Sequence, residues 1–439
     1  MARTRKSLLT RLETLAQFAL NAFPARYCRS STLQDPDSPA AFIAECSRQE
    51  FLNGLAAMPV VRRAIVVFVW PPAMVLLAGA LTLANGIRIE RRYHRSIARQ
   101  FAEQMRLTFV HGVSPALYYY YELHEPENRL RVHEYVMRAQ LKRGGNMYKR
   151  LYRECPQRRH RASILNNKIA FAQFSRDRHL PTPRLFGIVE NGIFRRADAE
   201  DKSLPRTNLF IKPSNENGGD GAERWTYDDG VYRGKDRRQL SEPELSRHLA
   251  RASRRAPLLI QECLVNHPEL RDLTAGALST LRIYTFLNEA GEVEHIFSML
   301  RMSRDSRRIV DNVCRGGLAA KVDPATGTIG PATDSGTLAR TGWLDRHPFT
   351  GAPLSGRPIP FWREALALAI SAHREIEAPF MVGWDIAITA AGPVIVEGNK
   401  APDVDIEQRL SGPWGNQRFG ELLAYHLKNA MRDIAVSPP

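Results

Sequence analysis

Cysteine is scarce in this 439-residue sequence, which contains only Cys28, Cys46, Cys155, Cys263 and Cys314. The number is odd, and no two of them are spaced like metal ligands or a redox pair. These features exclude a disulfide-rich secreted domain and a cysteine-based zinc site. We expect reduced thiols in a cytoplasmic domain.

The sequence also lacks internal repeats, long low-complexity tracts and any helix-turn-helix, zinc-finger or RNA-binding signature. Acidic residues are outnumbered, with 46 Asp and Glu against 62 Lys and Arg. The imbalance is concentrated in residues 1–150, which hold 22 basic and 11 acidic side chains. Because no nucleic-acid-binding signature accompanies this positive charge, we expect no nucleic-acid partner.

An uncharged stretch of twenty residues, Ala64 to Leu83, is the longest apolar run. As a helix it would cross about 30 Å of hydrocarbon. Arginines flank it on both sides, and Pro71-Pro72 lies near its middle. A kinked membrane span and a re-entrant hairpin both fit, and the two basic flanks favour the hairpin with its ends in the cytoplasm. A buried core helix is the alternative.

The remaining N-terminal sequence indicates helices. Met1 to Phe23 has apolar residues at helical spacing among basic ones, which suits either an anionic membrane surface or a solvent-facing helix. Ile87 to Val110 and Glu127 to Lys142 are predicted helices, and Tyr118 to Tyr121 between them is interpreted as a packed aromatic segment. We therefore predict a basic helical region with its membrane segment 64–83 over residues 1–100 and a second helical region over 101–160.

From about residue 160, short apolar or alternating runs separated by Gly, Pro and Asn indicate strands with helices between them. The predicted strands are Leu209 to Ile211, Leu258 to Ile260, Leu281 to Leu287, Ile296 to Met302 and Val394 to Val396. This texture predicts an α+β domain over residues 161–430.

Two carboxylates stand out near the end of that domain. Asp385 follows Trp384, and Glu397 and Asn399 follow an apolar run, with a turn expected around Ala391-Gly392. On paired strands these three side chains would converge, and their oxygens are the ligands that Mg²⁺ prefers. Surface carboxylates on a hairpin are the alternative interpretation.

A lysine ahead of a glycine-rich segment is the second candidate for chemistry. Lys212-Pro213 ends a predicted strand and leads into SNENGGDG, whose glycines allow backbone amides to approach phosphate oxygens. The segment is neither a Walker sequence nor a dinucleotide fingerprint, and taken alone it also fits a hairpin turn.

The order of these signals resembles the ATP-grasp superfamily. The motifs are Asn166-Asn167-Lys168 opening a helix, the Lys-Pro strand with its glycine loop, Gln261-Glu262 leaving a strand, Arg282 on a strand, and the final Asp…Glu-x-Asn set. Supporting features are Leu278 to Tyr284, Val310-Asp311-Asn312 before Gly316-Gly317, and His347-Pro348-Phe349. The sequence is most similar to the sugar-transfer-associated branch, over roughly residues 110–425. The resemblance implies an ATP-grasp fold, two α+β subdomains clasping ATP.

For the nucleotide, the resemblance implies that Lys168 and Lys212 contact the ATP phosphates. The backbone at Gly218, Gly219 and Gly221 is expected to cover those phosphates.

The adenine and ribose are expected to lie against Gln261, Glu262 and Leu264, with Glu269 as a further ribose ligand. Many relatives carry a hydrophobic-acidic pair at the place where Cys263 follows Glu262, so this sequence departs from the pattern there.

For catalysis, the resemblance implies that Arg282 and Arg301 face the γ-phosphate or an acyl phosphate. Asp385, Glu397 and Asn399 are expected to hold Mg²⁺.

The implied reaction is an ATP- and Mg-dependent ligation that forms ADP and phosphate, in which a carboxylate becomes an acyl phosphate and an amine or another nucleophile displaces the phosphate. The expected setting is cell-surface polysaccharide or glycoconjugate biosynthesis at the cytoplasmic face of the inner membrane. Expected partners are small-molecule carboxylate and nucleophile substrates, membrane lipid and glycosyltransferases. The alternative is a membrane scaffold that binds ATP without turnover and recruits glycosyltransferases.

Overall fold

A computed structural model gives the fold. It describes residues 35–143, 147–154, 160–197, 203–214, 221–235, 237–274, 276–306, 311–313, 316–334, 342–377 and 380–436. The predicted helix from Met1 to Phe23 and three of the five cysteines lie outside these ranges. The other two, Cys46 and Cys263, carry free thiols, as expected.

The chain divides into two compact units. The helical unit comprises residues 1–156, 335–342 and 403–439, and the two-sheet unit comprises residues 157–334 and 343–402. The C-terminal segment after Pro402 therefore belongs to the same compact unit as the N-terminal helices.

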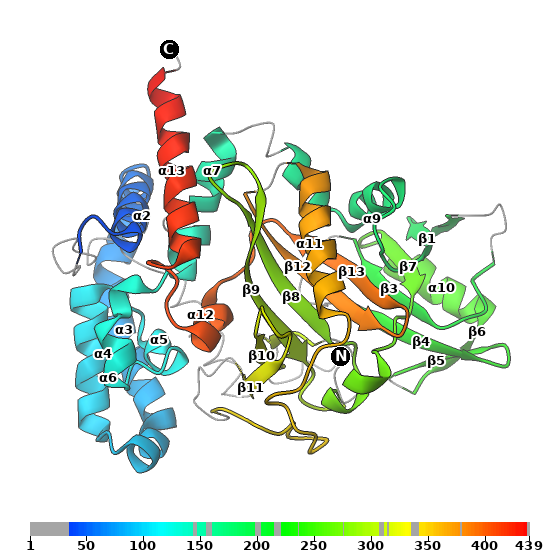
Figure 1. The fold of residues 1–439 in the computed structure, drawn as a ribbon, viewed down its shortest axis with the longest axis horizontal. Coiled ribbons are helices and arrows are strands. Elements are labelled where there is room, and N and C mark those ends of the chain that lie inside the picture. The colour runs from blue at the N-terminus through cyan, green and yellow to red at the C-terminus, as the bar shows by residue number, and fades with distance from the viewer. Residues whose placement is uncertain are drawn as a thin grey trace. The chain divides into compact units, whose positions relative to one another are not determined.

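Helices make up the described part of the helical unit (Figure 1). They are α2 (Pro39–Ala56), α3 (Val60–Tyr93), α4 (Ile97–His111), α5 (Pro115–Tyr120), α6 (Pro126–Leu130), η3 (Val132–Glu134), η4 (Ala139–Arg143), α7 (Met147–Glu154), α12 (Asp405–Ser411) and α13 (Arg418–Val436). Within this unit, α13 runs beside α2 and α7 (Figure 1).

The apolar run forms a single continuous helix, α3, which passes through Pro71 and Pro72 without turning back. The favoured re-entrant hairpin was therefore wrong. Apolar side chains at helical spacing on both sides of the prolines, including Trp70, Met74 and Leu77, are buried in one cluster with residues of α4 and α5. This packing holds the helix together where the prolines remove backbone donors. By length and hydropathy, Phe68–Tyr93 of α3 could cross a membrane.

Two helix predictions in this unit need correction. The expected helix from Ile87 to Val110 is broken at His94, which adopts the left-handed conformation, and Ser96 then caps α4 by accepting a hydrogen bond from the Arg99 N–H.

The predicted packing of Tyr118 to Tyr121 is confirmed, since all four side chains are buried.

The expected helix from Glu127 to Lys142 is instead split into three short pieces. Between them, the backbone of Val136 is held by Gln408, which accepts from the Val136 N–H at 2.9 Å and donates to its carbonyl at 2.7 Å. A continuous helix would use those backbone groups internally, so the long-range pairing overrides the local pattern.

The two-sheet unit contains two antiparallel sheets, each with its own helix, which confirms the α+β class. The seven-stranded sheet has the order β2-β1-β7-β3-β4-β5-β6, and the six-stranded sheet has the order β11-β10-β9-β8-β12-β13. Their strands are β1 (Leu185–Glu190), β2 (Ile193–Arg196), β3 (Leu209–Pro213), β4 (Glu223–Asp228), β5 (Val231–Gly234), β6 (Gln239–Ser241), β7 (Leu258–Glu262), β8 (Thr280–Leu287), β9 (Val293–Met302), β10 (Leu318–Val322), β11 (Ile329–Thr333), β12 (Met381–Thr389) and β13 (Gly392–Asn399). All five predicted strands are present.

Helices cover both sheets within this unit. They are η5 (Ser163–Asn166), α9 (Lys168–Asp177), α10 (Glu242–Ala252), η6 (Pro268–Leu273) and α11 (Trp362–Ile376). Leu245 and Leu249 of α10 join the core of the seven-stranded sheet. Figure 1 shows α11 lying across the six-stranded sheet, where Ala365, Ala369 and Ala372 allow close approach.

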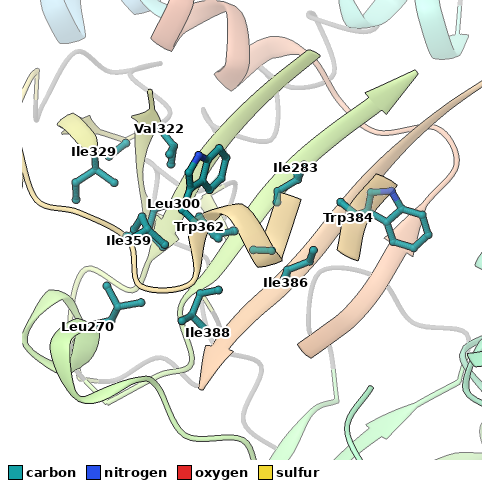
Figure 2. Close-up of a cluster of buried hydrophobic side chains, with 14 of the residues drawn as sticks. Leu270, Ile283, Leu300, Val322, Ile329, Ile359, Trp362, Trp384, Ile386 and Ile388 are labelled. Carbon is teal, nitrogen blue, oxygen red and sulfur yellow. The ribbon is translucent and has the colours of Figure 1, made fainter. Parts of the chain in front are cut away.

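The largest core lies between α11 and the six-stranded sheet (Figure 2). Ile283 of β8 and Ile386 of β12 are fully buried there, together with Trp384. Because side chains alternate along a strand, residues such as Trp384 and Ile386 fill this core while the residue between them, Asp385, points to the opposite face. The packed face therefore fixes which side chains the other face presents.

Candidate active site

The hairpin of β12 and β13 presents the two predicted carboxylates. Asp385 lies opposite Glu397 in the strand pairing, with an irregularity directly after Asp385, and Gly383 lies opposite Asn399. The Asn399 amide donates to Glu397 Oε1 at 3.4 Å and to the Gly383 carbonyl at 3.5 Å. The predicted convergence of the three side chains is thus explained by register alone.

Asp385 joins two arginines from neighbouring strands. Arg282 Nε on β8 lies 2.5 Å from Asp385 Oδ1, and Arg301 Nη2 on β9 lies 2.8 Å from Oδ2. Asp385 is only 3% exposed, so burial opposes its charge, but Arg282 and Arg301 outweigh burial and lower its pKa to about 2. The carboxylate is ionised at neutral pH and fixes the positions of both guanidinium groups.

A second buried carboxylate, Asp311, holds the other side of Arg301. The Thr280 hydroxyl donates to Asp311 Oδ2 at 2.6 Å and accepts from Arg301 Nη2 at 2.6 Å. Arg301 Nη2 is itself 3.6 Å from Asp311 Oδ1. Burial raises the pKa of Asp311, partly offset by Arg301 and Thr280. For Arg301, burial is outweighed by Asp311 and Asp385, so its pKa is raised and it stays charged.

The roles of Thr280 and Asp311 were missed by sequence reasoning, which noted their segments without assigning them a function. The two residues are 31 positions apart in the sequence, and the Thr280 N–H also donates to Asp311 Oδ2 at 2.8 Å. The local signal in the sequence was an aspartate, Asp311, ahead of two consecutive glycines, Gly316-Gly317.

Lys212, on β3 of the other sheet, is a buried cation. Its side chain is 9% exposed, and within the described ranges its ammonium has no hydrogen-bond or ion-pair partner. Burial lowers its pKa to about 8; Glu397 and Asp385 oppose that shift, and Lys168 adds to it. A buried ammonium without a partner is costly, so this position favours binding of an anion.

A cavity gathers these groups in the two-sheet unit. Predicted residues on its wall are Lys168, Lys212, Gln261, Glu262, Leu264, Arg301, Asp385 and Glu397. Unpredicted residues on its wall are Pro183, Phe210, Pro213, Ala222, Arg224, Cys263, Leu278, Thr280, Asp311, Asn312 and Val396. Apolar and charged walls in one space suit a ligand with an aromatic part and an anionic part.

A second cavity shares Lys168, Lys212 and Glu397 with the first and adds Asn399 and Lys400. The two cavities therefore meet at the lysines and the carboxylate. Lys168 is the first residue of α9, where Asn167 caps the helix, as the sequence predicted.

Not every predicted residue lies on these walls. Arg282 acts through Asp385, and Gly221 adopts a positive φ of 70° in the connection between β3 and β4. Gly218 and Gly219 lie outside the described residues. Glu269 is exposed in η6 and lines neither cavity.

The donor set suits magnesium bound together with a polyanion. In the described ranges no three His, Cys, Asp or Glu residues cluster as a self-sufficient metal site. Mg²⁺, however, is commonly held by one or two carboxylates, with phosphates and waters completing its octahedron. Asp385 and Glu397 supply the two carboxylates on adjacent strands, and the Asn399 amide adds an oxygen.

Several solved structures resemble this chain. D-alanyl-alanine synthetase A from Vibrio cholerae matches at 9% identity and a TM-score of 0.36, covering 61% of this chain and 66% of that one. D-alanine–D-alanine ligase from Bacillus anthracis gives 12% identity, a TM-score of 0.35 and coverage of 61% and 68%. D-alanine–D-alanine ligase from Coxiella burnetii matches at 9% identity and a TM-score of 0.34, covering 62% of this chain and 61% of that one. This chain thus spans about two-thirds of the length of these ligases.

No match was found among curated protein sequences. A family model described as sugar-transfer associated ATP-grasp matches residues 146–413, more than half of the chain. That range includes every residue of the two cavities. The chain therefore belongs to the sugar-transfer-associated ATP-grasp family.

Proposed function

We propose that this protein binds Mg-ATP in the first cavity and is a ligase that activates a carboxylate as an acyl phosphate. The observation that carries the proposal is Lys212, buried without a hydrogen-bond or ion-pair partner among the described residues, on the same cavity wall as Arg301, which Asp385 holds together with Arg282. Asp385 and Asp311 pair with the arginines, but burying Lys212 is unfavourable unless a polyanion occupies the space next to it. Membership of an ATP-grasp family supports ATP as that polyanion.

In this proposal the nucleotide lies along the wall of the first cavity. Lys168 and Lys212 bind phosphate oxygens. The base and ribose lie against Gln261, Glu262 and Leu264. Gln261 and Glu262 are the last two residues of β7. Glu269 has no part in the proposal, because it lies away from both cavities.

Asp385, Glu397 and Asn399 would hold the magnesium ion, which supplies neutralising charge to the phosphate oxygens when bound. Arg301 faces the same space and Arg282 keeps Asp385 oriented. The carboxylate oxygen of the substrate attacks the γ-phosphorus as the bond to ADP breaks. An amine or other nucleophile then displaces phosphate from the acyl carbon and gives up its proton. Fixed cations around the transferring group favour the transition state because they need no reorganisation.

For the setting, we propose cell-surface polysaccharide or glycoconjugate synthesis at the cytoplasmic face of a membrane, in company with glycosyltransferases. Support comes from the family description and from the apolar helix α3. The experiment below is designed to identify the carboxylate and the nucleophile.

The test is a screen of the purified protein with Mg-ATP and pairs of amino acids and nucleotide sugars, measuring ADP release. We expect one carboxylate class to stimulate release, and Glu397→Gln to abolish that stimulation. ATP binding with no stimulated turnover by any pair, and with equal affinity in Glu397→Gln, would favour a scaffold that binds ATP without ligation.

A further inference from the structure

Helix α3 has two apolar faces, and the residues that the structure describes cover one of them. Trp70, Met74, Leu77, Leu81 and Ile89 are buried against α4 and α5. On the other face, large apolar side chains are exposed to solvent: Phe68 by 76%, Val69 by 53%, Val75 by 40%, Leu76 by 75%, Leu83 by 84% and Ile87 by 55%. Helical spacing places these residues in one stripe about five turns long.

Buried hydrogen bonds attach the covered face to α4. Gln100 donates to the Gly86 carbonyl at 3.0 Å, and Gln104 donates to Thr82 Oγ1 at 2.7 Å. Both glutamine side chains are fully buried. Separating α3 from α4 would leave these groups unsatisfied, so the helices stay together.

Charges on α4 prevent the helix pair from being surrounded by lipid. Arg99 and Arg106 are exposed on α4, and Glu103 forms ion pairs with Arg95, Arg99 and Arg129. Placing such charges at the centre of a bilayer is costly. Only the stripe of α3 is suited to hydrocarbon.

The stripe ends in positive charge. Arg88, Arg91 and Arg92 are exposed in the last two turns of α3. One acidic residue, Glu90, lies among them, so this end of the helix is net positive. An apolar stripe continued by arginines matches the acyl and headgroup layers of an anionic bilayer surface.

We propose that α3 lies in the plane of an anionic bilayer surface and does not cross it. The stripe from Phe68 to Ile87 enters the acyl boundary, and Arg88, Arg91 and Arg92 contact the anionic headgroups. The inference rests on the helical unit alone and is independent of the proposed ligase chemistry. In this arrangement α3 makes no transmembrane passage.

Vesicle flotation of the full-length protein tests the surface. We expect binding to phosphatidylcholine vesicles that contain phosphatidylglycerol, and weaker binding without it. Leu76→Asp with Leu83→Asp should lose binding by tenfold or more. The matched control is Ile193→Asp, which alters a 59%-exposed isoleucine of β2 and should bind as the wild type. Arg88→Glu with Arg91→Glu should lose the preference for the anionic lipid.

Depth measurement separates the in-plane helix from a span. With native cysteines replaced by serine, fluorophores placed singly at Phe68→Cys, Leu76→Cys and Ile87→Cys should be quenched equally by brominated lipids of one depth. A much deeper position for Leu76→Cys than for Phe68→Cys and Ile87→Cys would show a span and overturn the proposal, because a span across about 30 Å of hydrocarbon has its middle near the bilayer centre and its ends near the interfaces. Absence of vesicle binding, with a concentration-dependent dimer that Leu76→Asp and Leu83→Asp abolish, would also overturn it by assigning the stripe to a second copy.

Discussion

The active-site cavity and the α3–α5 layer bury polar groups in opposite ways. Around the cavity several of the buried or largely buried polar side chains are charged, among them Lys212, Arg301, Asp311 and Asp385. In the α3–α5 layer the buried groups are neutral, with amides and hydroxyls bonded to one another, while large apolar side chains face outward.

The difference indicates what each surface receives. Buried ions cost several kcal/mol each unless a partner offsets the desolvation, and among the described residues the pairing in the cavity leaves Lys212 without one. The neutral layer holds a helix whose other apolar side is left exposed by the described residues. A polyanionic ligand fits the first surface, and a lipid surface fits the second.

The largest effect is expected from Glu397→Gln, which weakens a magnesium ligand without removing an ion-pair partner of the arginines. We expect ATP turnover to fall about a thousandfold, since an amide is a poor substitute for a carboxylate on Mg²⁺. Steady-state kinetics and a thermal melt measure turnover and folding. Asp385→Asn should lose turnover too, but also about 3–5 kcal/mol of stability, because it removes the carboxylate that pairs with Arg282 and one of the two that pair with Arg301. A fully active Glu397→Gln would remove the metal site from the account.

Two leucines of α3 sharpen the contrast within one helix. Leu81 is 1% exposed and Leu83 is 84% exposed. Leu81→Ala should cost about 3 kcal/mol of unfolding free energy through lost contacts and a cavity. Leu83→Ala should stay within about 0.5 kcal/mol of the wild type. Denaturant titration of both variants checks this, and equal losses would mean that the stripe is covered within the chain.

A smaller effect is expected from Thr280→Val, which removes the hydroxyl between Asp311 and Arg301. Leaving these groups unsatisfied costs about 1–3 kcal/mol, so the turnover rate should fall roughly tenfold to a hundredfold. ATP affinity should change much less if, as proposed, Arg301 contacts the transferring group mainly in the transition state. Thr280→Ser keeps the hydroxyl and should restore the rate. Parallel losses of rate and affinity would make Arg301 a ground-state nucleotide ligand.

The smallest effect concerns pH. Lys212 has a pKa lowered to about 8, so its charge is present at pH 7 and is lost as the pH rises through 8. Binding of ATP at higher pH must then take up a proton, and the ATP dissociation constant should rise about tenfold between pH 7 and pH 9. Lys212→Arg stays charged over this range and should show a flatter profile by calorimetry. An identical profile in both proteins would show that Lys212 does not contact the phosphates.

Local sequence patterns were sufficient for the strands and for the carboxylate hairpin, whereas most of the other predicted cavity residues followed from the motif resemblance. Alternation predicted the β12–β13 hairpin, whose register brings Asp385 opposite Glu397. The place of Lys168 at the start of α9 was predicted from the motif Asn166-Asn167-Lys168. Alternation depends on a few neighbouring residues, which is why a single sequence discloses it.

Long-range contacts account for what was not predicted. The backbone of Val136 is bound by Gln408, 272 residues away, and Thr280 bonds to Asp311, 31 residues away. Likewise, the apolar run of α3 is the same in sequence whether the helix is surrounded by lipid or half covered by α4. Only the contacts that α3 makes with other helices in the folded protein distinguish these two possibilities.

The most direct test of the central claim follows an oxygen atom. Once a carboxylate that stimulates ADP release is identified, it can be labelled with oxygen-18, and the phosphate released in a complete reaction can be analysed by mass spectrometry. If the carboxylate is activated as an acyl phosphate, the products are ADP and phosphate, and the phosphate carries one labelled oxygen. Unlabelled phosphate, or the formation of AMP and pyrophosphate, would contradict the account.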